Sequence, residues 1–150
     1  MRFVDILTAR RIAVPIEATD KSSALRALAE LLVDDVEGGD AAEIARVFEE
    51  REKLSTTGVG SGVAIPHGRM ANVPKVLAAV GISRSGIEFD SIDGQPVHIL
   101  VALLAPRNLD HLKALARISR MLRSQHARSE IIGATSAAGA LERIRAADGP

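Results

Sequence analysis

The sequence contains no cysteine, tryptophan or tyrosine, and aromatic residues make up only 2% of its 150 positions. Without cysteine there can be no disulfide bond, thiolate metal site or cysteine nucleophile, which fits a reducing compartment. The scarcity of aromatic rings argues against stacking platforms for nucleic-acid bases. Because 19 Lys and Arg residues balance 19 Asp and Glu residues, no net field attracts nucleic acid or an anionic membrane.

Long hydrophobic runs are also absent. The longest apolar run, around residues 99–105, is far shorter than the roughly 18 residues of a membrane-spanning helix. Asp5, Arg10 and Arg11 stand where a signal peptide needs an unbroken apolar core. We therefore expect a cytoplasmic protein without membrane insertion. Its length and its hydrophobic fraction of 47% predict one globular domain over residues 1–150.

The first part of the chain predicts a short strand followed by a helix. Residues 12–16 have the composition of a strand, and Pro15 indicates an edge position in a sheet. Asp20 can cap a helix that continues to about Val33, because apolar residues recur on one of its faces (Leu25, Leu28, Ala29 and Leu32).

A second helix is predicted from Asp40, which with Glu43 resembles a capping box, to about Lys53. Glu49 and Lys53 are spaced to form an ion pair. The apolar stripe of this helix (Ile44, Val47 and Phe48) continues into Arg51, where a guanidinium is costly unless it meets an anion or reaches water. From the helix alone, an Arg51 side chain that extends its charged head to water (snorkelling) is as good an explanation as a functional role. Its place just before a glycine-rich segment favours a functional role.

Two apolar runs, residues 76–83 and 97–104, lack polar alternation and are therefore predicted as strands covered on both faces. The alternation over residues 87–89 and the turn signal Asp93-Gly94 indicate that part of the sheet is antiparallel. Helices before, between and after these strands predict an α/β layered domain.

A later helix is predicted from Asn108 or Asp110 to about Arg123, with His111 in its first turn. His111 begins the buried stripe of this helix, which continues through Leu115, Ile118 and Leu122. The opposite face is basic (Lys113, Arg117 and Arg120), and we interpret it as solvated rather than as a docking surface. Two shorter helices are predicted near the end of the chain (after Gln125, and over residues 137–147).

The segment Ser55–Arg69 combines a glycine-rich stretch (Gly58, Gly60 and Gly62) with a histidine. Such glycines allow a tight turn that leaves backbone N–H groups free for a ligand. Pro66 fixes the chain direction before His67, and Gly68 leaves room for backbone beside the imidazole. An imidazole held beside free amides is suited to carrying or donating an anionic group. We therefore predict that His67 is phosphorylated; an ordinary loop histidine is the alternative.

The other histidines differ in their surroundings. His111 lies at a predicted helix N-terminus, where the positive end of the dipole favours a neutral ring that can form hydrogen bonds. It is either a hydrogen-bonding partner beside His67 or a satisfied core histidine. His98, within a strand, and His126, near a helix start, are interpreted as structural or exposed.

Several other kinds of site are excluded by spacing. No two histidines have the spacing of a zinc site. The stretch Gly58–Gly62 matches neither the dinucleotide-binding motif, nor the P-loop, nor the nucleophile elbow of hydrolases. Phosphoryl transfer requires little more than positioning and charge stabilisation, and in principle no metal when the donor is a phosphohistidine. Neither a metal nor a cofactor is therefore expected.

The segment Ser55–Arg69 resembles the active-site segment of enzyme IIA domains of the fructose/mannitol superfamily in the bacterial phosphotransferase system. The resemblance extends over nearly the whole chain, through Arg51-Glu52, Asp93–Val97 and Asp110–Arg117. The stand-alone, nitrogen-regulatory type is the most similar within this superfamily. The resemblance implies a single-domain mixed β-sheet flanked by helices on both faces. It also implies a histidine that accepts phosphoryl from a small histidine phosphocarrier protein.

The resemblance also assigns site residues. Its phosphorylated histidine, its arginine and its second histidine map onto His67, Arg51 and His111. One departure is the short stretch Pro106–Asp110, in which Arg107 stands where the family pattern leads us to expect an acidic residue. This departure bears on how His111 approaches His67 and on which partner surface is recognised.

We therefore expect a phosphotransferase of the phosphocarrier kind that acts on a regulatory target protein. One alternative is a sugar-transport enzyme IIA that passes phosphoryl to an enzyme IIB; the lack of a fused IIB or membrane domain favours regulation. An alternative of another class is a non-catalytic regulatory module that binds its targets through the basic helix. Only such a module would take up no label from a phosphorylated carrier.

Overall fold

The centre of the fold is an antiparallel pair of long strands, β5 (Leu77–Ile87) and β6 (Val97–Ala105). The computed structural model describes residues 1–150, apart from the side chain of Asn108. Both apolar runs form strands, and the antiparallel pairing expected from the sequence is confirmed. β5 extends beyond its predicted end at residue 83, because the pairing resumes after an irregularity that includes Gly86, whose φ is +90°.

Four shorter strands complete a six-stranded mixed sheet. β1 (Ile12–Ala13) pairs in parallel with β5 and forms one edge, as Pro15 indicates. On the other side of β6, β3 (Val63–Ala64) and β4 (His67–Arg69) follow one another, both parallel to β6. β2 (Gly58–Gly60) pairs antiparallel with β3. The mixed sheet implied by the resemblance is thus confirmed.

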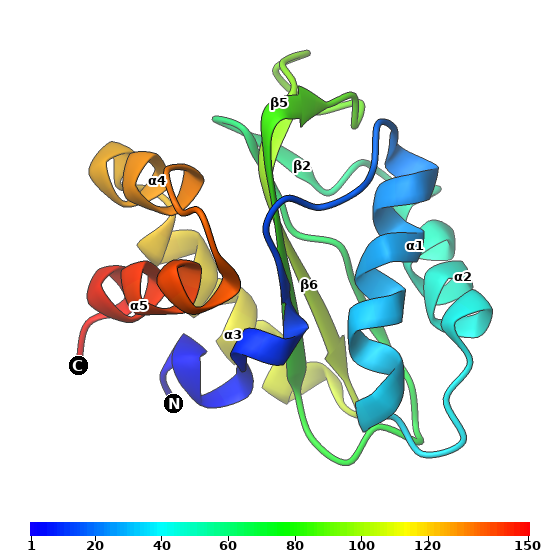
Figure 1. The fold of residues 1–150 in the computed structure, drawn as a ribbon. Coiled ribbons are helices and arrows are strands. Elements are labelled where there is room, and N and C mark those ends of the chain that lie inside the picture. Colours follow the sequence, from blue (N-terminus) through cyan, green and yellow to red (C-terminus); the bar gives the residue numbers. More distant parts are fainter.

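Helices lie on both faces of this sheet (Figure 1). One face is covered by α1 (Lys21–Leu32) and α2 (Ala41–Glu52), the other by α3 (Asn108–Met121), α4 (Gln125–Ile132) and α5 (Ala137–Asp148). Three 3-10 turns precede β1 or follow α1: η1 (Phe3–Ile6), η2 (Ala9–Arg11) and η3 (Val33–Asp35). The α/β class is confirmed. None of the helices formed by the described residues combines the length and apolarity that crossing a bilayer requires.

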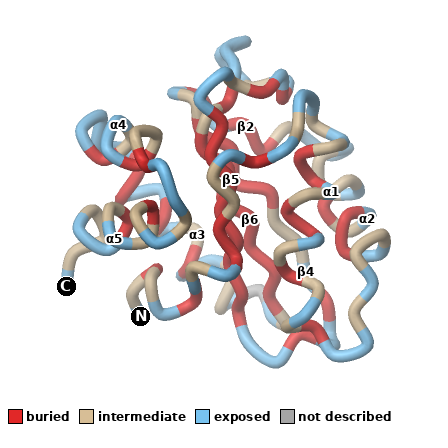
Figure 2. Tube along the Cα trace, viewed as in Figure 1, coloured by how far each residue is buried: buried red, intermediate tan, exposed pale blue. Residues whose placement is uncertain are grey.

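Alternate side chains of β6 supply two hydrophobic cores. Val101 and Leu103 belong to the core under α3 and α5, whereas Leu100 and Ala102 belong to the core under α1 and α2. This division follows from the geometry of a strand, whose successive side chains point to opposite faces. Figure 2 shows β5 and β6 largely buried between helices whose outer surfaces are exposed. The sheet therefore separates two packed layers.

Two local interactions of α2 differ from the predictions. Asp40 accepts a backbone N–H of the first turn at 2.9 Å, so the cap is confirmed, but this N–H is not that of Glu43 and no capping box forms. Lys53 Nζ lies 3.0 Å from a carboxylate oxygen of Glu50, so the predicted pair with Glu49 is wrong. Residues three and four positions apart are both neighbours on a helix surface, so spacing alone does not select between them.

Arg117 does not belong to a solvated basic face. Its Nε donates to Asp148 Oδ1 at 2.7 Å, and its Nη2 donates to the Asp148 carbonyl at 2.8 Å. The Asp148 side chain is fully buried, and its other oxygen accepts the N–H of Val4 at 3.2 Å. Lys113 and Arg120 are exposed, as predicted. Arg117 instead joins α3 to the end of α5, a contact between distant segments that helix periodicity does not reveal.

Replacing Asp148 with asparagine is expected to lower the free energy of unfolding by about 1–3 kcal/mol, because a buried hydrogen bond to a charged group is lost. Urea unfolding measures this change. The matched control is Glu142→Gln, since Glu142 forms an exposed pair with Arg145 at 3.5 Å. Such a surface pair contributes less than about 1 kcal/mol. Equal losses in the two variants would contradict the structural role of Asp148.

Candidate functional site

The glycine-rich stretch forms the turn between β2 and β3 rather than an open anion-binding loop. Gly60 has a φ of +96°, in the left-handed region that favours glycine. The N–H of Ser61 donates to Asp93 Oδ2 at 3.0 Å, and the N–H of Gly58 donates to the Thr56 hydroxyl at 3.1 Å. The prediction that the amides of this stretch remain free for a ligand is therefore wrong for these two positions.

His67 is the first residue of β4, whereas the sequence analysis placed it in a turn. The N–H of Leu103 in β6 donates to the Pro66 carbonyl at 2.9 Å, which fixes the backbone just before His67. Gly68 faces α2, because a Cβ atom at this position would overlap the Val47 side chain. The glycine thus allows α2 to approach β4 closely, and the end of that helix lies beside His67.

Hydrogen bonds define the tautomer of the half-buried His67 ring. Its Nδ1 lies 2.8 Å from the Ile65 carbonyl, which can only accept, so Nδ1 carries the hydrogen. Its Nε2 therefore holds the lone pair and accepts a hydrogen bond from Arg51 Nε at 3.2 Å. Burial lowers the pKa of His67 below its ordinary value; the Arg51 charge lowers it too, while the Ile65 carbonyl and the Glu52 charge oppose them. The neutral ring exposes its nucleophilic Nε2 to Arg51.

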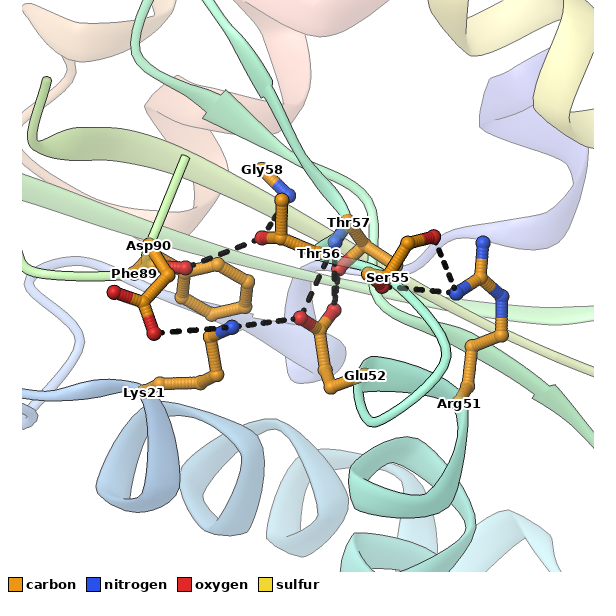
Figure 3. A network of polar contacts seen from close by, with 9 residues as sticks. All are labelled: Lys21, Arg51, Glu52, Ser55, Thr56, Thr57, Gly58, Phe89 and Asp90. Carbon is orange, nitrogen blue, oxygen red and sulfur yellow. Dashed lines mark hydrogen bonds and ion pairs between the residues drawn. The ribbon is translucent and has the colours of Figure 1, made fainter. Parts of the chain in front are cut away.

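Arg51 occupies the inward position that the apolar stripe of α2 indicates. Besides contacting His67, its guanidinium donates from Nη1 to the Ser55 carbonyl at 3.0 Å (Figure 3). These two contacts hold the planar group at the end of α2, against the ring nitrogen that has the lone pair. The sequence analysis favoured a functional role for Arg51 from its place before the glycine-rich segment, and the structure brings it into contact with His67.

His111 contacts the ring of His67 from the first turn of α3. The two ring centroids are 4.4 Å apart at an interplanar angle of 70°. His111 Nδ1 is buried and has no hydrogen-bond partner among the side chains and backbone that the structure describes. Burial lowers the pKa of His111, and positive charge on His67, Arg51 and Arg69 lowers it further. The sequence analysis attributed a neutral ring to the helix N-terminus, but burial is the largest cause.

A short connection places His111 at this position. β6 ends at Ala105 and α3 begins at Asn108, so only Pro106 and Arg107 separate them. Arg107 stands where an acidic residue was expected. It is exposed and pairs with Asp110 at 3.3 Å. The short segment therefore does not keep His111 away from His67.

Three large apolar side chains stay exposed next to these residues. Leu54 follows the end of α2 that carries Arg51, and Leu109 and Leu112 flank His111 in α3. Leucines of this kind are more often turned inward in a folded domain. The segments that carry Arg51 and His111 thus also expose apolar side chains.

The remaining histidines lie elsewhere, and the predictions for them are confirmed. His98 is in β6, and its Nδ1 lies 2.9 Å from the Ser83 carbonyl, which gives the ring a structural contact. His126 is exposed in the first turn of α4. Neither contacts the cluster around His67.

The sequence analysis gave no role to Glu52, although its side chain joins this region. Glu52 binds Thr57 and Lys21, and its charge acts on His67. A signal was present: Glu52 lies four positions after Phe48 on the buried stripe of α2, where a carboxylate needs partners. Those partners lie in α1 and just before β2, and no local pattern identifies them.

The fold is thus a mixed sheet covered on both faces, with one arginine and two histidines clustered at His67. The chain belongs to the family described as phosphoenolpyruvate-dependent sugar phosphotransferase system, EIIA 2, whose family model matches residues 5–147. The family assignment made from Ser55–Arg69 is thus confirmed.

Individual relatives carry two kinds of name. A nitrogen regulatory protein of Bradyrhizobium diazoefficiens is 40% identical over 127 residues, which cover 83% of this chain and 82% of that protein. The fructose-specific EIIABC component of Bacillus subtilis is 32% identical over 138 residues, 91% of this chain but only 22% of that protein. The crystal structure of nitrogen regulatory protein IIA-Ntr from Neisseria meningitidis has a TM-score of 0.87 at 30% identity, covering 95% of this chain and 98% of that one.

Proposed function

We propose that this protein is a phosphohistidine relay in which His67 Nε2 accepts phosphoryl from a histidine phosphocarrier protein. The phosphorylation state of the protein then serves as a regulatory signal of the nitrogen type. The observation that carries this proposal is the tautomer of His67. Its Nδ1–H is engaged by the Ile65 carbonyl at 2.8 Å, and its Nε2 lone pair faces Arg51 at 3.2 Å. A neutral, oriented imidazole of this kind is an activated nucleophile.

The transfer exchanges one nitrogen–phosphorus bond for another. The Nε2 lone pair attacks phosphorus, the bond to the carrier histidine breaks, and its electron pair returns to the carrier ring. The His67 ring becomes positively charged while it keeps the Nδ1 hydrogen, and the Ile65 carbonyl stabilises that charge. Arg51 Nε moves its hydrogen bond from Nε2 to a phosphoryl oxygen, where a planar guanidinium binds well.

His111 assists the transfer without carrying phosphate. Its ring lies against His67, with centroids 4.4 Å apart. Its buried Nδ1, in the tautomer that carries the hydrogen there, can donate a hydrogen bond to a phosphoryl oxygen. Positioning and charge stabilisation of this kind supply most of the catalysis in phosphoryl transfer. Metal ions and cofactors have no part in this scheme.

The surroundings of the cluster support a protein as donor. Leu54, which follows α2, and Leu109 and Leu112, which lie in α3 near His111, expose apolar side chains on the segments that carry the cluster. A small substrate is usually enclosed by its site, whereas exposed apolar side chains on such segments suit a protein surface that must dock and leave. We infer that the partners of this relay are a phosphocarrier protein as donor and a downstream regulatory target.

The nitrogen-regulatory reading is supported by the relative named as a nitrogen regulatory protein, which is 40% identical and aligns over most of both chains. A sugar-transport role, with phosphoryl passed to an enzyme IIB, is supported by the fructose-specific relative, of which this chain matches 22%. The two roles share the same chemistry at His67 and differ in the acceptor.

The decisive experiment offers the purified protein labelled phosphoenolpyruvate, enzyme I and a phosphocarrier. Label on the protein, with a phosphorus–nitrogen coupling assigned to Nε2 of His67, is the expected result. A protein that takes no label would be a binding module instead. Loss of the label on addition of an enzyme IIB, and not otherwise, would favour the sugar-transport alternative.

Replacing His111 distinguishes a role in phosphoryl transfer from a role in packing alone. His111→Ala is expected to slow transfer about ten- to hundredfold, since a hydrogen bond to a charged group contributes roughly 1.5–3 kcal/mol. His111→Gln keeps an amide donor of similar reach and should retain more of the rate. Rapid-quench measurement of transfer from the carrier gives each rate. If wild type, Gln and Ala transfer equally fast, His111 is only a core histidine.

A further inference from the structure

The Glu52 carboxylate, at the last residue of α2, is buried but has no part in the transfer described above. Its side chain is only 6% exposed. One of its oxygens accepts the Thr57 N–H at 2.9 Å and the Thr57 hydroxyl, and the other lies 2.9 Å from Lys21 Nζ (Figure 3). A buried carboxylate is stable only with such partners, so this arrangement is specific rather than incidental.

Lys21 brings a third element to the same carboxylate. It is the first residue of α1, and its ammonium lies 4.9 Å from the centroid of the buried Phe89 ring. The ammonium is also 3.9 Å from Asp90, but that side chain is 93% exposed and contributes little. The contact with Glu52 therefore ties the beginning of α1 to the end of α2.

Hydrogen bonds connect Glu52 to the Nδ1 side of the His67 ring, whereas on the Nε2 side it is linked only by its position next to Arg51 in the chain. On one side, Arg51 is its neighbour in the chain and donates to Nε2 at 3.2 Å. On the other side, Glu52 holds Thr57, whose carbonyl accepts the Ile65 N–H at 2.9 Å. The carbonyl of Ile65 in turn accepts the Nδ1 hydrogen at 2.8 Å. The carboxylate of Glu52 thus anchors the chain of hydrogen bonds that ends at Nδ1 of His67.

The charge of Glu52 also favours the transfer, through its effect on the pKa of His67. It raises the pKa of His67, against the lowering by burial and by Arg51. The negative charge therefore offsets part of the field of the guanidinium and favours the positive ring that forms as the phosphorus bond is made.

We propose that Glu52, held by Lys21 and Thr57, is a positioning residue that fixes the orientation and tautomer of His67 for phosphoryl transfer. The proposal rests on the relay function proposed for His67. In this role Glu52 does not act on the ring directly; it acts through Thr57 and Ile65, whose hydrogen bonds lead to Nδ1.

The test combines transfer kinetics with nitrogen NMR of the His67 ring. In Glu52→Ala, kcat for transfer is expected to fall about ten- to hundredfold, as small misplacements of a reacting group do. KM for the carrier should stay constant, because the exposed leucines are unaltered. The ring spectrum should change from one Nδ1–H tautomer to a mixture. Glu52→Gln keeps an acceptor for Thr57 and should restore the tautomer and part of the rate.

Glu50 provides the matched control, because it lies in the same helix but is exposed and pairs with Lys53 at the surface. Glu50→Ala and Glu50→Gln should keep the wild-type rate and spectrum. A Glu52→Ala protein with wild-type kcat and tautomer, even if less stable, would overturn the proposal. If Glu52→Ala does not fold, Glu52→Gln provides the test. A transfer rate of Glu52→Gln equal to that of Glu50→Gln would then overturn the proposal. A wild-type protein that takes no phosphoryl refutes the relay, whereas the tautomer spectrum still tests Glu52.

Discussion

Replacing His67 with alanine is expected to abolish phosphoryl uptake while leaving the protein folded. The substitution removes the nucleophilic nitrogen, and in the proposed transfer the other imidazole of the cluster, His111, assists without accepting phosphoryl. The lost bond to the Ile65 carbonyl, 2.8 Å in the structure, should lower the free energy of unfolding by only about 0.5–1.5 kcal/mol. Mass spectrometry after incubation with the phosphorylated carrier measures uptake, and urea unfolding measures stability.

The control for this variant is His126→Ala, since His126 is exposed in α4 and lies apart from the cluster. It should take up phosphoryl like the wild type. The phosphate on the wild-type protein should be labile in acid and stable in base, as phosphohistidine is. Label that persists in the His67→Ala protein would place the phosphorylated residue elsewhere.

Arg51→Met is expected to slow transfer by about two to three orders of magnitude, the range found when one charge-stabilising donor is removed from a catalytic site. Methionine has an unbranched apolar side chain of similar length, so the packing of α2 should persist and stability should change by less than about 1 kcal/mol. Arg51→Lys should restore only part of the rate, because an ammonium lacks the planar fork that binds phosphoryl oxygens. Rapid-quench kinetics with the phosphorylated carrier measures all three proteins.

Arg46→Met is the matched control, because Arg46 is another arginine of the same helix whose side chain is exposed. Its transfer rate should equal that of the wild type, which separates a specific role of Arg51 from a general loss of positive charge. An Arg51→Met protein that transfers at full rate would show that Arg51 only snorkels at the helix end.

Much of the fold is predictable because several elements carry their own local signals. Asp20 caps α1, as its position before an apolar stripe predicts, and its side chain accepts the Ser23 N–H at 2.8 Å. The apolar runs of β5 and β6 predict strands buried on both faces. The same reasoning that finds the stripe of α2 also identifies Arg51 as a charged residue at an inward position, which is how the sequence indicates part of the site.

The parts that escaped prediction depend on distant segments. β4 consists of His67, Gly68 and Arg69, which have no strand-like composition; they are extended because β6 pairs with them. The pairing of Arg117 with Asp148 and of Glu52 with Lys21 likewise joins positions 31 residues apart. In each case the tertiary neighbour, and not the local sequence, determines what the side chain does.

The separation of the domain into two packed layers has a consequence for how its sequence can change. Arg51 is carried by α2 on one face of the sheet, His111 is carried by α3 on the other face, and His67 lies in β4 within the sheet. A substitution that shifts packing in either layer therefore moves one partner of His67 relative to the other. Selection for phosphoryl transfer then acts on both cores at once, so viable substitutions in one layer are expected to depend on residues already present in the other.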